Sequence, residues 1–489
     1  MTTTVTDRYE TTVGLEIHVE LATASKMFCG CAVAFAGEPN ARTCPVCLGL
    51  PGSLPVANER AVEYTLKIAL ALNCHIAEHS LFHRKNYFYP DMPKNYQISQ
   101  YDLPLGSQGF VEISGDFGTT RVGINRVHLE EDTGKSIHVG GSGRIADSDY
   151  SLEDFNRAGT PLVEIVSEPD ISSAEEARVF VTELRALLES LGVSDVRMEE
   201  GSMRVDANVS VRPSGEKEYG AKVEVKNMNS IKSVGRALAY EEERQRKALE
   251  AGQILIQETR HFDEKTGTTS SLRTKEFAFD YRYFPEPDLV PFEPPAQWVE
   301  EIRTSLPELP VARRERFGQE YGLGDYDIEV LSGSTATADF FERAARAYDG
   351  DAKKVANWIT ADLFGLLNEA GTEIGAVKIA PEQLAGLVAL IDSGEISGKQ
   401  AKVVLADMFA TGKDPAAVAT EKGLRQVSDA GELEAAVDEV IAENADAADK
   451  VRAGNTGTIG FLVGQVMKKT RGQANPKMVN ELLARKLTQ

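Results

Sequence analysis

The chain has 489 residues, of which 42% are hydrophobic and 26% charged, and its formal net charge is −22. One hydrophobic core seldom serves so long a chain, so the sequence predicts two to four domains of ordinary globular composition. No apolar run reaches membrane-spanning length, and the first residues lack a basic segment followed by an apolar one. We therefore expect a cytoplasmic protein without a membrane partner.

Residues 13–21 alternate between apolar and polar side chains, which predicts a β-strand. Because side chains alternate faces along a strand, Glu16, His18 and Glu20 share one face, and apolar residues occupy the other. Two carboxylates beside an imidazole are typical of a site for a hard cation. The alternative is a polar face that is merely solvated, as in many antiparallel sheets.

Four of the five cysteines form two close pairs, Cys29 with Cys31 and Cys44 with Cys47. Two such pairs folded together are the ligand set of a structural zinc site. A redox pair at Cys44 and Cys47 is the alternative, but no βαβ pattern surrounds it. Four thiolates leave the zinc no open position for chemistry. The sequence therefore predicts a zinc ion that fixes the loop after the first strand.

An apolar run at helical spacing covers residues 65–77 and contains the fifth cysteine, Cys74, which we expect in the core. His75, His79 and His83 follow at intervals of four residues, as metal ligands on a helix would. The helical pattern fades soon after His83. The sequence therefore does not favour a metal site formed by these histidines.

Helices predicted over residues 172–192 and 230–252 alternate with strands over residues 204–212 and 221–226. Ser172 with Glu175 three residues later predicts a capping box at the start of the first helix. Short connections between such elements are typical of an α+β fold with a largely antiparallel sheet.

Both of these strands carry a polar face, and residues 128–132 add three acids beside an imidazole. Cations and carboxylates on one sheet face are the set that phosphoryl transfer uses when no P-loop is present. Residues 131–136 end like a P-loop, but Leu129 stands where that motif needs glycine.

Five prolines in residues 284–295 forbid a helix there and predict a domain boundary. The pattern that follows is helical almost throughout, with a weaker boundary near residue 411. We expect three domains, namely residues 1–293, 294–410 and 411–489. From Lys450 to Gln489 there are eight basic residues and one acid, which favours either a phosphate contact or a solvated basic helix.

Seven motifs together resemble the B-subunit family of the aspartyl/glutamyl-tRNA(Asn/Gln) amidotransferases. They occur in order along nearly the whole chain, at residues 13–21, 84–91, 93–99, 128–132, 156–162, 280–288 and 472–476. The resemblance implies a catalytic cradle domain related to glutamine synthetase and guanido kinases, followed by a helical domain and a tail domain.

The resemblance also implies a reaction in which ATP phosphorylates the side-chain carboxylate of misacylated Glu-tRNA(Gln) or Asp-tRNA(Asn), and ammonia then displaces the phosphate. Glu16, His18 and Glu131 match the residues that hold Mg²⁺ in this family. Lys85 matches a cation near the ammonia passage. Strand phase adds four side chains to the expected catalytic site: Glu130, Asp206, Asn208 and Glu224.

The implied partners are an amidase-family A subunit that supplies ammonia from glutamine and a small C subunit, in a heterotrimer. The basic end matches the family's tail, which grips tRNA. We expect its contacts at Lys468, Lys469, Arg471 and Lys477. The alternative function is a non-catalytic, zinc-containing tRNA-binding scaffold.

Overall fold

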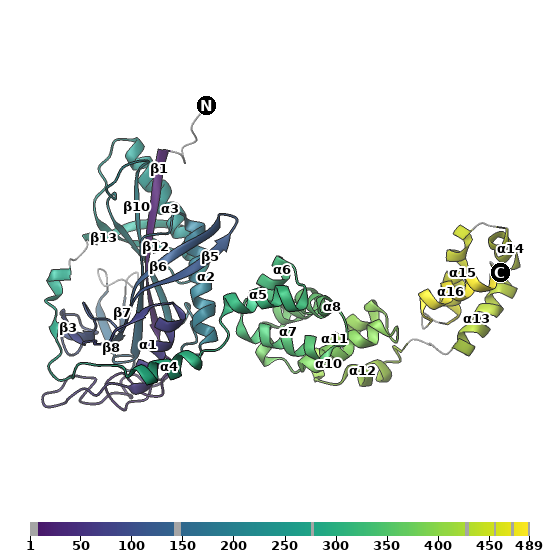
Figure 1. The fold of residues 1–489 in the computed structure, drawn as a ribbon, viewed down its shortest axis with the longest axis horizontal. Coiled ribbons are helices and arrows are strands. Elements are labelled where there is room, and N and C mark those ends of the chain that lie inside the picture. The colour runs from purple at the N-terminus through teal and green to yellow at the C-terminus, as the bar shows by residue number, and fades with distance from the viewer. Residues whose placement is uncertain are drawn as a thin grey trace. The chain divides into compact units, whose positions relative to one another are not determined.

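The structure is a computed structural model. It describes residues 8–140, 148–274, 278–425, 430–453, 456–470 and 474–487. The chain divides into two compact units, Met1–Pro310 and Val311–Gln489 (Figure 1). Among the described residues, no helix combines the length and the apolar character needed to cross a membrane.

The first unit contains the strands of the molecule that the structure describes. Their bounds are β1 (Tyr9–Glu20), β2 (His75–Ile76), β3 (His83–Asn86), β4 (Tyr96–Ser99), β5 (Gly106–Gly115), β6 (Gly118–Glu131), β7 (Lys135–Val139), β8 (Tyr150–Asp154), β9 (Pro161–Ser167), β10 (Met203–Pro213), β11 (Val223–Lys226), β12 (Glu258–Asp263), β13 (Thr268–Thr274) and β14 (Phe284–Pro285).

Nine of these strands form one sheet in the order β13-β12-β11-β10-β1-β9-β6-β5-β2. Neighbouring strands are antiparallel except β11 and β12, which run parallel. Smaller sheets consist of β14, β3 and β4, and of β7 and β8. The predicted strand at residues 13–21 is the central strand β1, so its two neighbours can bring side chains from distant segments beside it.

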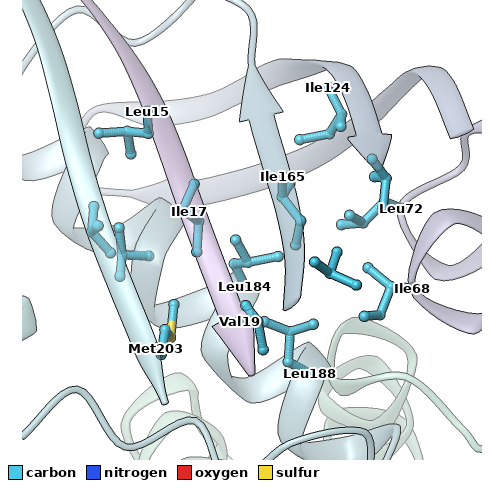
Figure 2. Close-up of a cluster of buried hydrophobic side chains, with 14 of the residues drawn as sticks. Leu15, Ile17, Val19, Ile68, Leu72, Ile124, Ile165, Leu184, Leu188 and Met203 are labelled. Carbon is cyan, nitrogen blue, oxygen red and sulfur yellow. The ribbon is translucent and has the colours of Figure 1, made fainter. Parts of the chain in front are cut away.

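Helices cover the apolar face of this sheet. They are α1 (Glu59–Ala71), α2 (Ala174–Ser190) and α3 (Ile231–Glu250). Helix α4 (Ala296–Thr304) packs against α1, and the short 3₁₀ helix η3 (Ala278–Tyr281) precedes β14. Figure 2 shows Leu184 and Leu188 of α2 and Ile68 of α1 beside Ile17 and Val19 of β1. Each of these side chains is fully buried. Burial of one such side chain contributes about 1.5–3 kcal/mol, which fixes the strand's apolar face inward and its polar face outward.

The cap of α2 differs from the prediction by one residue. Ser173, not Ser172, is the N-cap, and its hydroxyl accepts a hydrogen bond from the Glu176 backbone N–H at 3.1 Å. The Glu176 carboxylate in turn accepts from the backbone N–H and the hydroxyl of Ser172, both at 2.8 Å. The helix predicted from residue 230 begins as expected, with Ser230 as the N-cap of α3.

The helix predicted over residues 65–77 ends early, at Ala71. Asn73 adopts a left-handed conformation with φ of 56°, which turns the chain toward β2. Cys74 is buried, as predicted. His75 lies in β2 and His83 in β3, so these histidines do not share a helix.

The second unit is helical in all its described elements, as predicted. They are α5 (Pro310–Tyr321), α6 (Asp325–Leu331), α7 (Thr335–Ala347), α8 (Ala352–Asn357), the π-helix η4 (Trp358–Leu363), α9 (Phe364–Ala370), η5 (Ile374–Ala376), α10 (Pro381–Asp392), α11 (Gly398–Thr411), α12 (Pro415–Glu421), α13 (Ala430–Glu443), α14 (Ala445–Arg452), η6 (Thr456–Thr458), α15 (Ile459–Lys469) and α16 (Pro476–Leu487). The molecule is therefore an α+β sheet unit followed by an α-helical region.

The described residues of the helical region form two hydrophobic clusters, one between Phe317 and Ala419 and one between Leu433 and Leu487. Beyond the proline-rich passage, α4 still packs against α1, and Ile302 belongs to the core of the first unit. Hydrophobic packing thus continues past residue 293 into α4. The division into domains at residues 293 and 410 stays a prediction.

Candidate active site and metal centre

The polar face of the large sheet carries charged side chains from five neighbouring strands. Register places His18 of β1 between Glu164 of β9 and Arg204 of β10. It also places His128 of β6 opposite Glu164. Residues that face each other across an antiparallel pair lie on the same side of the sheet. Segments more than 100 residues apart in sequence therefore meet on this face.

Four of these side chains form a compact acid–imidazole cluster. His18 Nε2 lies 3.8 Å from Glu130 Oε1 and 3.5 Å from Glu164 Oε2. His128 Nε2 lies 3.7 Å from Glu130 Oε2 and 3.4 Å from Glu164 Oε2. Donor atoms of His18, Glu130 and Glu164 all lie within 4.8 Å of one another. Oxygen and imidazole donors that converge in this way are a ligand set for a divalent cation.

Both carboxylates of this cluster are held in the ionised form. Burial opposes ionisation, but the charge of His128 and the hydrogen bond and charge of His18 lower the pKa of Glu164 well below its ordinary value. Burial also opposes ionisation of Glu130, whose pKa is lowered by a hydrogen bond from His128 and the charge of Lys85. The cluster therefore offers two anionic ligands, although each carboxylate is almost fully buried.

The pKa of His18 is shifted upward, not downward. Burial disfavours its protonated form, but the hydrogen bond to Glu164 and the charges of Glu164 and Glu130 outweigh burial and raise the pKa of His18. The raised pKa favours the protonated imidazole, whose charge would partly neutralise the two carboxylates. A metal ion would take that place, since metal binding and protonation compete for the same imidazole.

Glu16 and the predicted side chains of β10 and β11 lie beside this cluster. Asn208 Nδ2 donates to Glu16 Oε1 at 2.9 Å, and Asp206 is the register partner of Glu16. Lys226 forms an ion pair with Asp206 and lies 3.5 Å from Glu224 Oε1. Burial works against the charged form of Lys226, but Asp206 and Glu224 raise its pKa. The structure therefore brings Glu16, Asp206, Asn208 and Glu224 to one surface.

Glu131 points elsewhere. It follows Glu130 at the end of β6, so alternation turns the two carboxylates to opposite faces. The Glu131 carboxylate forms a buried ion pair with Lys94, and its Oε1 accepts from the Ile98 backbone N–H at 2.9 Å. The structure does not bring Glu131 to His18 and Glu16, with which the resemblance had grouped it.

Lys85 of β3 is half-buried near the acid cluster. Its Nζ lies 4.9 Å from the ring centroid of Tyr281, and its charge is among the groups that lower the pKa of Glu130. Tyr281 also contacts Tyr87 and Tyr283 edge to face. A cation held on an aromatic wall beside two carboxylates can stabilise negative charge that develops in their vicinity.

Two residues of the cluster escaped the sequence prediction. Glu164 lies in a strand whose other residues are mostly apolar, and His128 was noted only as a neighbour of acids. Arg126 Nη2 lies 3.2 Å from Glu164 Oε1, and Arg126 Nε donates to His128 Nδ1 at 3.3 Å. One signal for Glu164 was present in the sequence, because it is the lone carboxylate of an otherwise apolar strand. A buried charge needs a partner, so such a residue is expected to face other charged groups.

A second charged network lies at the Glu20 end of the polar face of the sheet and includes Asp132, Arg157 and Arg204. Burial and the nearby Asp132 carboxylate raise the pKa of Glu20 to about 8. Arg204 Nη1 lies 3.0 Å from Asp132 Oδ2, and Arg157 Nε lies 3.6 Å from the same oxygen. Burial disfavours ionisation of Asp132, but these two guanidinium groups and a hydrogen bond from Glu20 lower its pKa. Glu20 is thus engaged with Asp132, apart from the His18 cluster.

The four clustered cysteines converge as predicted. Their sulfur atoms all lie within 4.8 Å of one another, and Cys44 Sγ and Cys47 Sγ are 3.9 Å apart. Lys26 is 1% exposed and places its Nζ 3.7 Å from Cys47 Sγ. Zinc with four thiolates carries a net negative charge, part of which a buried ammonium offsets. The donor set and the buried Lys26 therefore fit a tetrahedral zinc site.

The basic tail is partly neutralised by the acidic helix α13. Lys469 Nζ lies 2.7 Å from Glu439 Oε2 and 2.6 Å from Glu443 Oε1. Two more ion pairs join α16 to α13, Arg485 with Glu434 and Lys486 with Asp438, both at 2.6 Å. Basic residues on these helices therefore serve packing within the tail as well as any external contact.

Two of the other residues predicted to contact tRNA are not paired with acids of the described tail as Lys469 is. Lys468 and Lys477 are exposed, and within the described part of the chain neither forms an ion pair. Arg471 lies outside the described residues. Lys468 and Lys477 are therefore the better candidates for an external phosphate.

Two family profiles match the chain. The profile described as the GatB/GatE catalytic domain matches residues 11–300, and the profile described as the GatB domain matches residues 339–487. A curated relative from Carboxydothermus hydrogenoformans, named as the B subunit of an aspartyl/glutamyl-tRNA(Asn/Gln) amidotransferase, is 55% identical over 479 residues, or 98% of this chain and 99% of the relative. Relatives of the same name from Caldanaerobacter subterraneus subsp. tengcongensis and Persephonella marina are 54% and 52% identical over 98% and 97% of this chain, and 100% and 98% of their own.

Proposed function

Since this chain belongs to the family of aspartyl/glutamyl-tRNA(Asn/Gln) amidotransferase B subunits, we propose that its large sheet activates the side-chain carboxylate of a misacylated tRNA with ATP. The chain is one component of a tRNA-dependent amidotransferase, a glutamine-hydrolysing carbon–nitrogen ligase. The single observation that carries the proposal is the cluster of His18, Glu130 and Glu164 on the polar face of the sheet. We further propose that the cradle is related to glutamine synthetase and guanido kinases.

The reaction has two steps. A carboxylate oxygen of the aminoacyl side chain attacks the γ-phosphorus of ATP, ADP leaves, and an acyl phosphate forms. Ammonia then attacks the carbonyl carbon, the carbon–oxygen bond to phosphate breaks, and one proton is lost, which gives Gln-tRNA(Gln) or Asn-tRNA(Asn). Activation is needed because a carboxylate is a poor electrophile and has no good leaving group.

The acid cluster fits Mg²⁺, because its two carboxylates are held ionised and converge with an imidazole. His18, Glu130 and Glu164 would hold the ion. Glu16 lies two residues before His18, on the same face of β1. A magnesium ion bound there would screen the repulsion between the carboxylate and the triphosphate. We assign Glu131 no contact with this ion, because its carboxylate is paired with Lys94.

The remaining predicted residues act around this centre. Asn208 orients Glu16 through its amide hydrogen bond. Thr259 Oγ1 donates to Glu224 Oε2 at 2.7 Å, and Glu224 together with Asp206 holds Lys226 in its charged form. Lys85 supplies a cation beside Glu130 that can stabilise charge on the transferring phosphoryl group.

We also propose that ammonia comes from an amidase-family A subunit and that a small C subunit completes a heterotrimer. The curated relatives are named as B subunits, which implies further subunits. The four cysteines would hold a structural zinc ion, and Lys26 would offset part of the negative charge of the thiolates. The tail would contact tRNA, with Lys468 and Lys477 as its phosphate contacts.

Replacing Glu16 by Gln tests the catalytic proposal in the assembled complex. Release of phosphate from ATP that depends on Glu-tRNA(Gln) is expected to fall by about 10²-fold, because a charge beside the proposed cation site is lost. The Kd for tRNA should not change. The alternative, a non-catalytic zinc-containing tRNA-binding scaffold, requires that phosphate release be unaffected.

Truncation after Arg425 tests the tail. Residues 411–425 should be kept, because Val418 and Ala419 are fully buried in the preceding hydrophobic cluster. The truncated complex is expected to bind tRNA at least about tenfold more weakly, with a smaller dependence of affinity on salt. Hydrolysis of glutamine in the complex should persist.

A paired substitution gives the finer test of the same surface. Lys468→Ala and Lys477→Ala should each lower tRNA affinity. Lys469→Ala should chiefly weaken the tail's own fold, since Lys469 joins α15 to α13. Equal tRNA affinity for all variants and for the truncated chain would contradict the proposed contact.

A further inference from the structure

Strand β6 changes the positions that it buries at a β-bulge. Ile124 is buried before the bulge, and Val127 and Leu129 are buried after it. Three steps separate Ile124 from Val127, although a regular strand buries every second residue. The register with β9 shifts just before Arg126, where β6 contains one additional residue. That residue turns Arg126 and His128 to the polar face of the sheet.

Arg126 joins two members of the acid–imidazole cluster. Its Nη2 lies 3.2 Å from Glu164 Oε1, and its Nε donates to His128 Nδ1 at 3.3 Å. Register places His128 opposite Glu164 of β9, and Arg126 opposite Val166 of the same strand. A guanidinium presents its N–H groups in a rigid fork, so one arginine holds both groups in a fixed relation.

The contact with Arg126 determines which ring nitrogen of His128 carries the proton. A guanidinium N–H can only donate, so Nδ1 of His128 must accept, and the ring proton lies on Nε2. This nitrogen lies 3.4 Å from Glu164 Oε2 and 3.7 Å from Glu130 Oε2. A ring nitrogen that carries a proton cannot bind a metal ion. His128 therefore presents an N–H group to the two carboxylates and is not a ligand.

The same contacts leave one oxygen of each carboxylate facing His18. Arg126 engages Glu164 Oε1, while Oε2 lies 3.5 Å from His18 Nε2. Ser99 Oγ donates to Glu130 Oε2 at 3.0 Å, while Oε1 lies 3.8 Å from His18 Nε2. The atoms that converge are thus one imidazole nitrogen and one oxygen from each carboxylate.

We propose that Arg126 and His128 are positioning residues of the proposed cation site. Arg126 fixes the tautomer of His128 and one oxygen of Glu164, and the Nε2–H of His128 orients the carboxylates of Glu130 and Glu164. This inference rests on the proposed function, because it takes the acid–imidazole cluster as the site of a divalent cation. Loss of a group that orients metal ligands usually lowers metal affinity about 10–100-fold.

The two histidines can be distinguished by electron spin-echo envelope modulation of Mn²⁺ bound to the assembled complex, which detects nitrogen bonded to the ion. The wild type should show one coordinated imidazole nitrogen. His18→Gln should remove this signal, and His128→Gln should keep it. Loss of the signal in His128→Gln alone would make His128 the ligand and overturn the proposal, with the proposed function intact. Mn²⁺ binding that neither His18→Gln nor Glu130→Gln weakens would contradict the cation site itself, and with it both proposals.

Arg126→Met separates orientation from charge. Loss of a positive charge beside the site would by itself tighten the binding of a cation. Loss of orientation should instead raise the Kd for Mn²⁺ about 10–100-fold, although Arg126 contacts no ion. Arg126 is 36% exposed at its side chain, so the strand can accept methionine. An unchanged or lower Kd would show that Arg126 does not position the ligands.

Two substitutions of His128 test its role as a donor. His128→Gln keeps an N–H group of similar reach, whereas His128→Leu removes it. The Kd for Mn²⁺ should rise at least about tenfold in His128→Leu and much less in His128→Gln. Equal effects of the two substitutions would contradict the donor role.

Arg121→Met is the matched control, because Arg121 is exposed on the same strand and lies over the ring of Phe110 at 3.6 Å. It removes the same charge from β6 without a contact to the cluster. Its Kd for Mn²⁺ and its nitrogen signal should equal those of the wild type. If Arg121→Met and Arg126→Met raise the Kd equally, the effect does not come from the cluster and the proposal is wrong.

Discussion

Glu130→Gln is expected to reduce ATP-dependent amide formation by about 10³-fold or more, the largest effect of any single substitution in the sheet. The glutamine keeps the size of Glu130, and Ser99 Oγ, which donates to Glu130 Oε2 at 3.0 Å, keeps a partner. What is lost is one of the two anionic ligands beside His18. Preorganised charge of this kind is usually the largest single contribution to such a reaction. Measurement of Mn²⁺ affinity by electron paramagnetic resonance should show a matching loss.

Glu131→Gln is the matched comparison, because the two residues are neighbours on opposite faces of β6. This change leaves Lys94, whose side chain is 6% exposed, without its anionic partner. Loss of one member of a buried ion pair costs about 3–5 kcal/mol, so the unfolding free energy of the first unit should fall while Mn²⁺ affinity is kept. If Glu131→Gln abolishes Mn²⁺ binding and Glu130→Gln does not, the cation assignment made from the sheet face is wrong.

Cys47→Ser should release about one equivalent of zinc and strongly destabilise the loop around residues 26–56. The site would lose a thiolate, and the buried Lys26 ammonium would lose the negative charge that balances it. Binding of a structural zinc ion contributes directly to folding free energy, on the order of 10 kcal/mol in small zinc domains. Metal analysis and the rate of limited proteolysis in this loop measure the two effects.

Cys74→Ser is the control for that experiment. Cys74 is also buried, but it lies outside the cysteine cluster in the hydrophobic core. It should keep the zinc and lose only the modest stability that a polar group costs in an apolar position. Equal zinc content in the wild-type and Cys47→Ser proteins would contradict the metal assignment.

Local patterns were sufficient for some elements of the first unit, namely β1, β10, α2 and α3, whereas the helix predicted over residues 65–77 ends early, at Ala71. The alternation of residues 13–21 predicted β1 and its two faces, because a period of two is a property of the strand itself. The serine before α3 predicted its start for the same kind of reason, since a cap is made within one turn. At α2 the prediction was one residue early, because Ser173 caps the helix and Glu176 reaches back to Ser172.

Cysteine spacing also predicted a feature that depends on few residues. The two cysteines of each close pair lie within one turn. The prediction therefore had to infer only that the two turns pack against each other. The structure brings all four sulfurs together. It adds Lys26, whose relation to Cys47 no spacing rule contains.

The sequence by itself determined β1 with its polar face, β10, the helices α2 and α3, the cysteine cluster and, through its motifs, the family. Only the tertiary structure decided which carboxylates meet His18. Glu164 joins the cluster because β9 pairs with β1 in a register that places it opposite His18, and Glu131 is excluded because alternation turns it toward Lys94. In the tail, the packing of α15 against α13 pairs Lys469 with Glu439 and Glu443. Alternation and capping act within one segment, whereas register joins segments far apart, and one residue of slip would reverse every face.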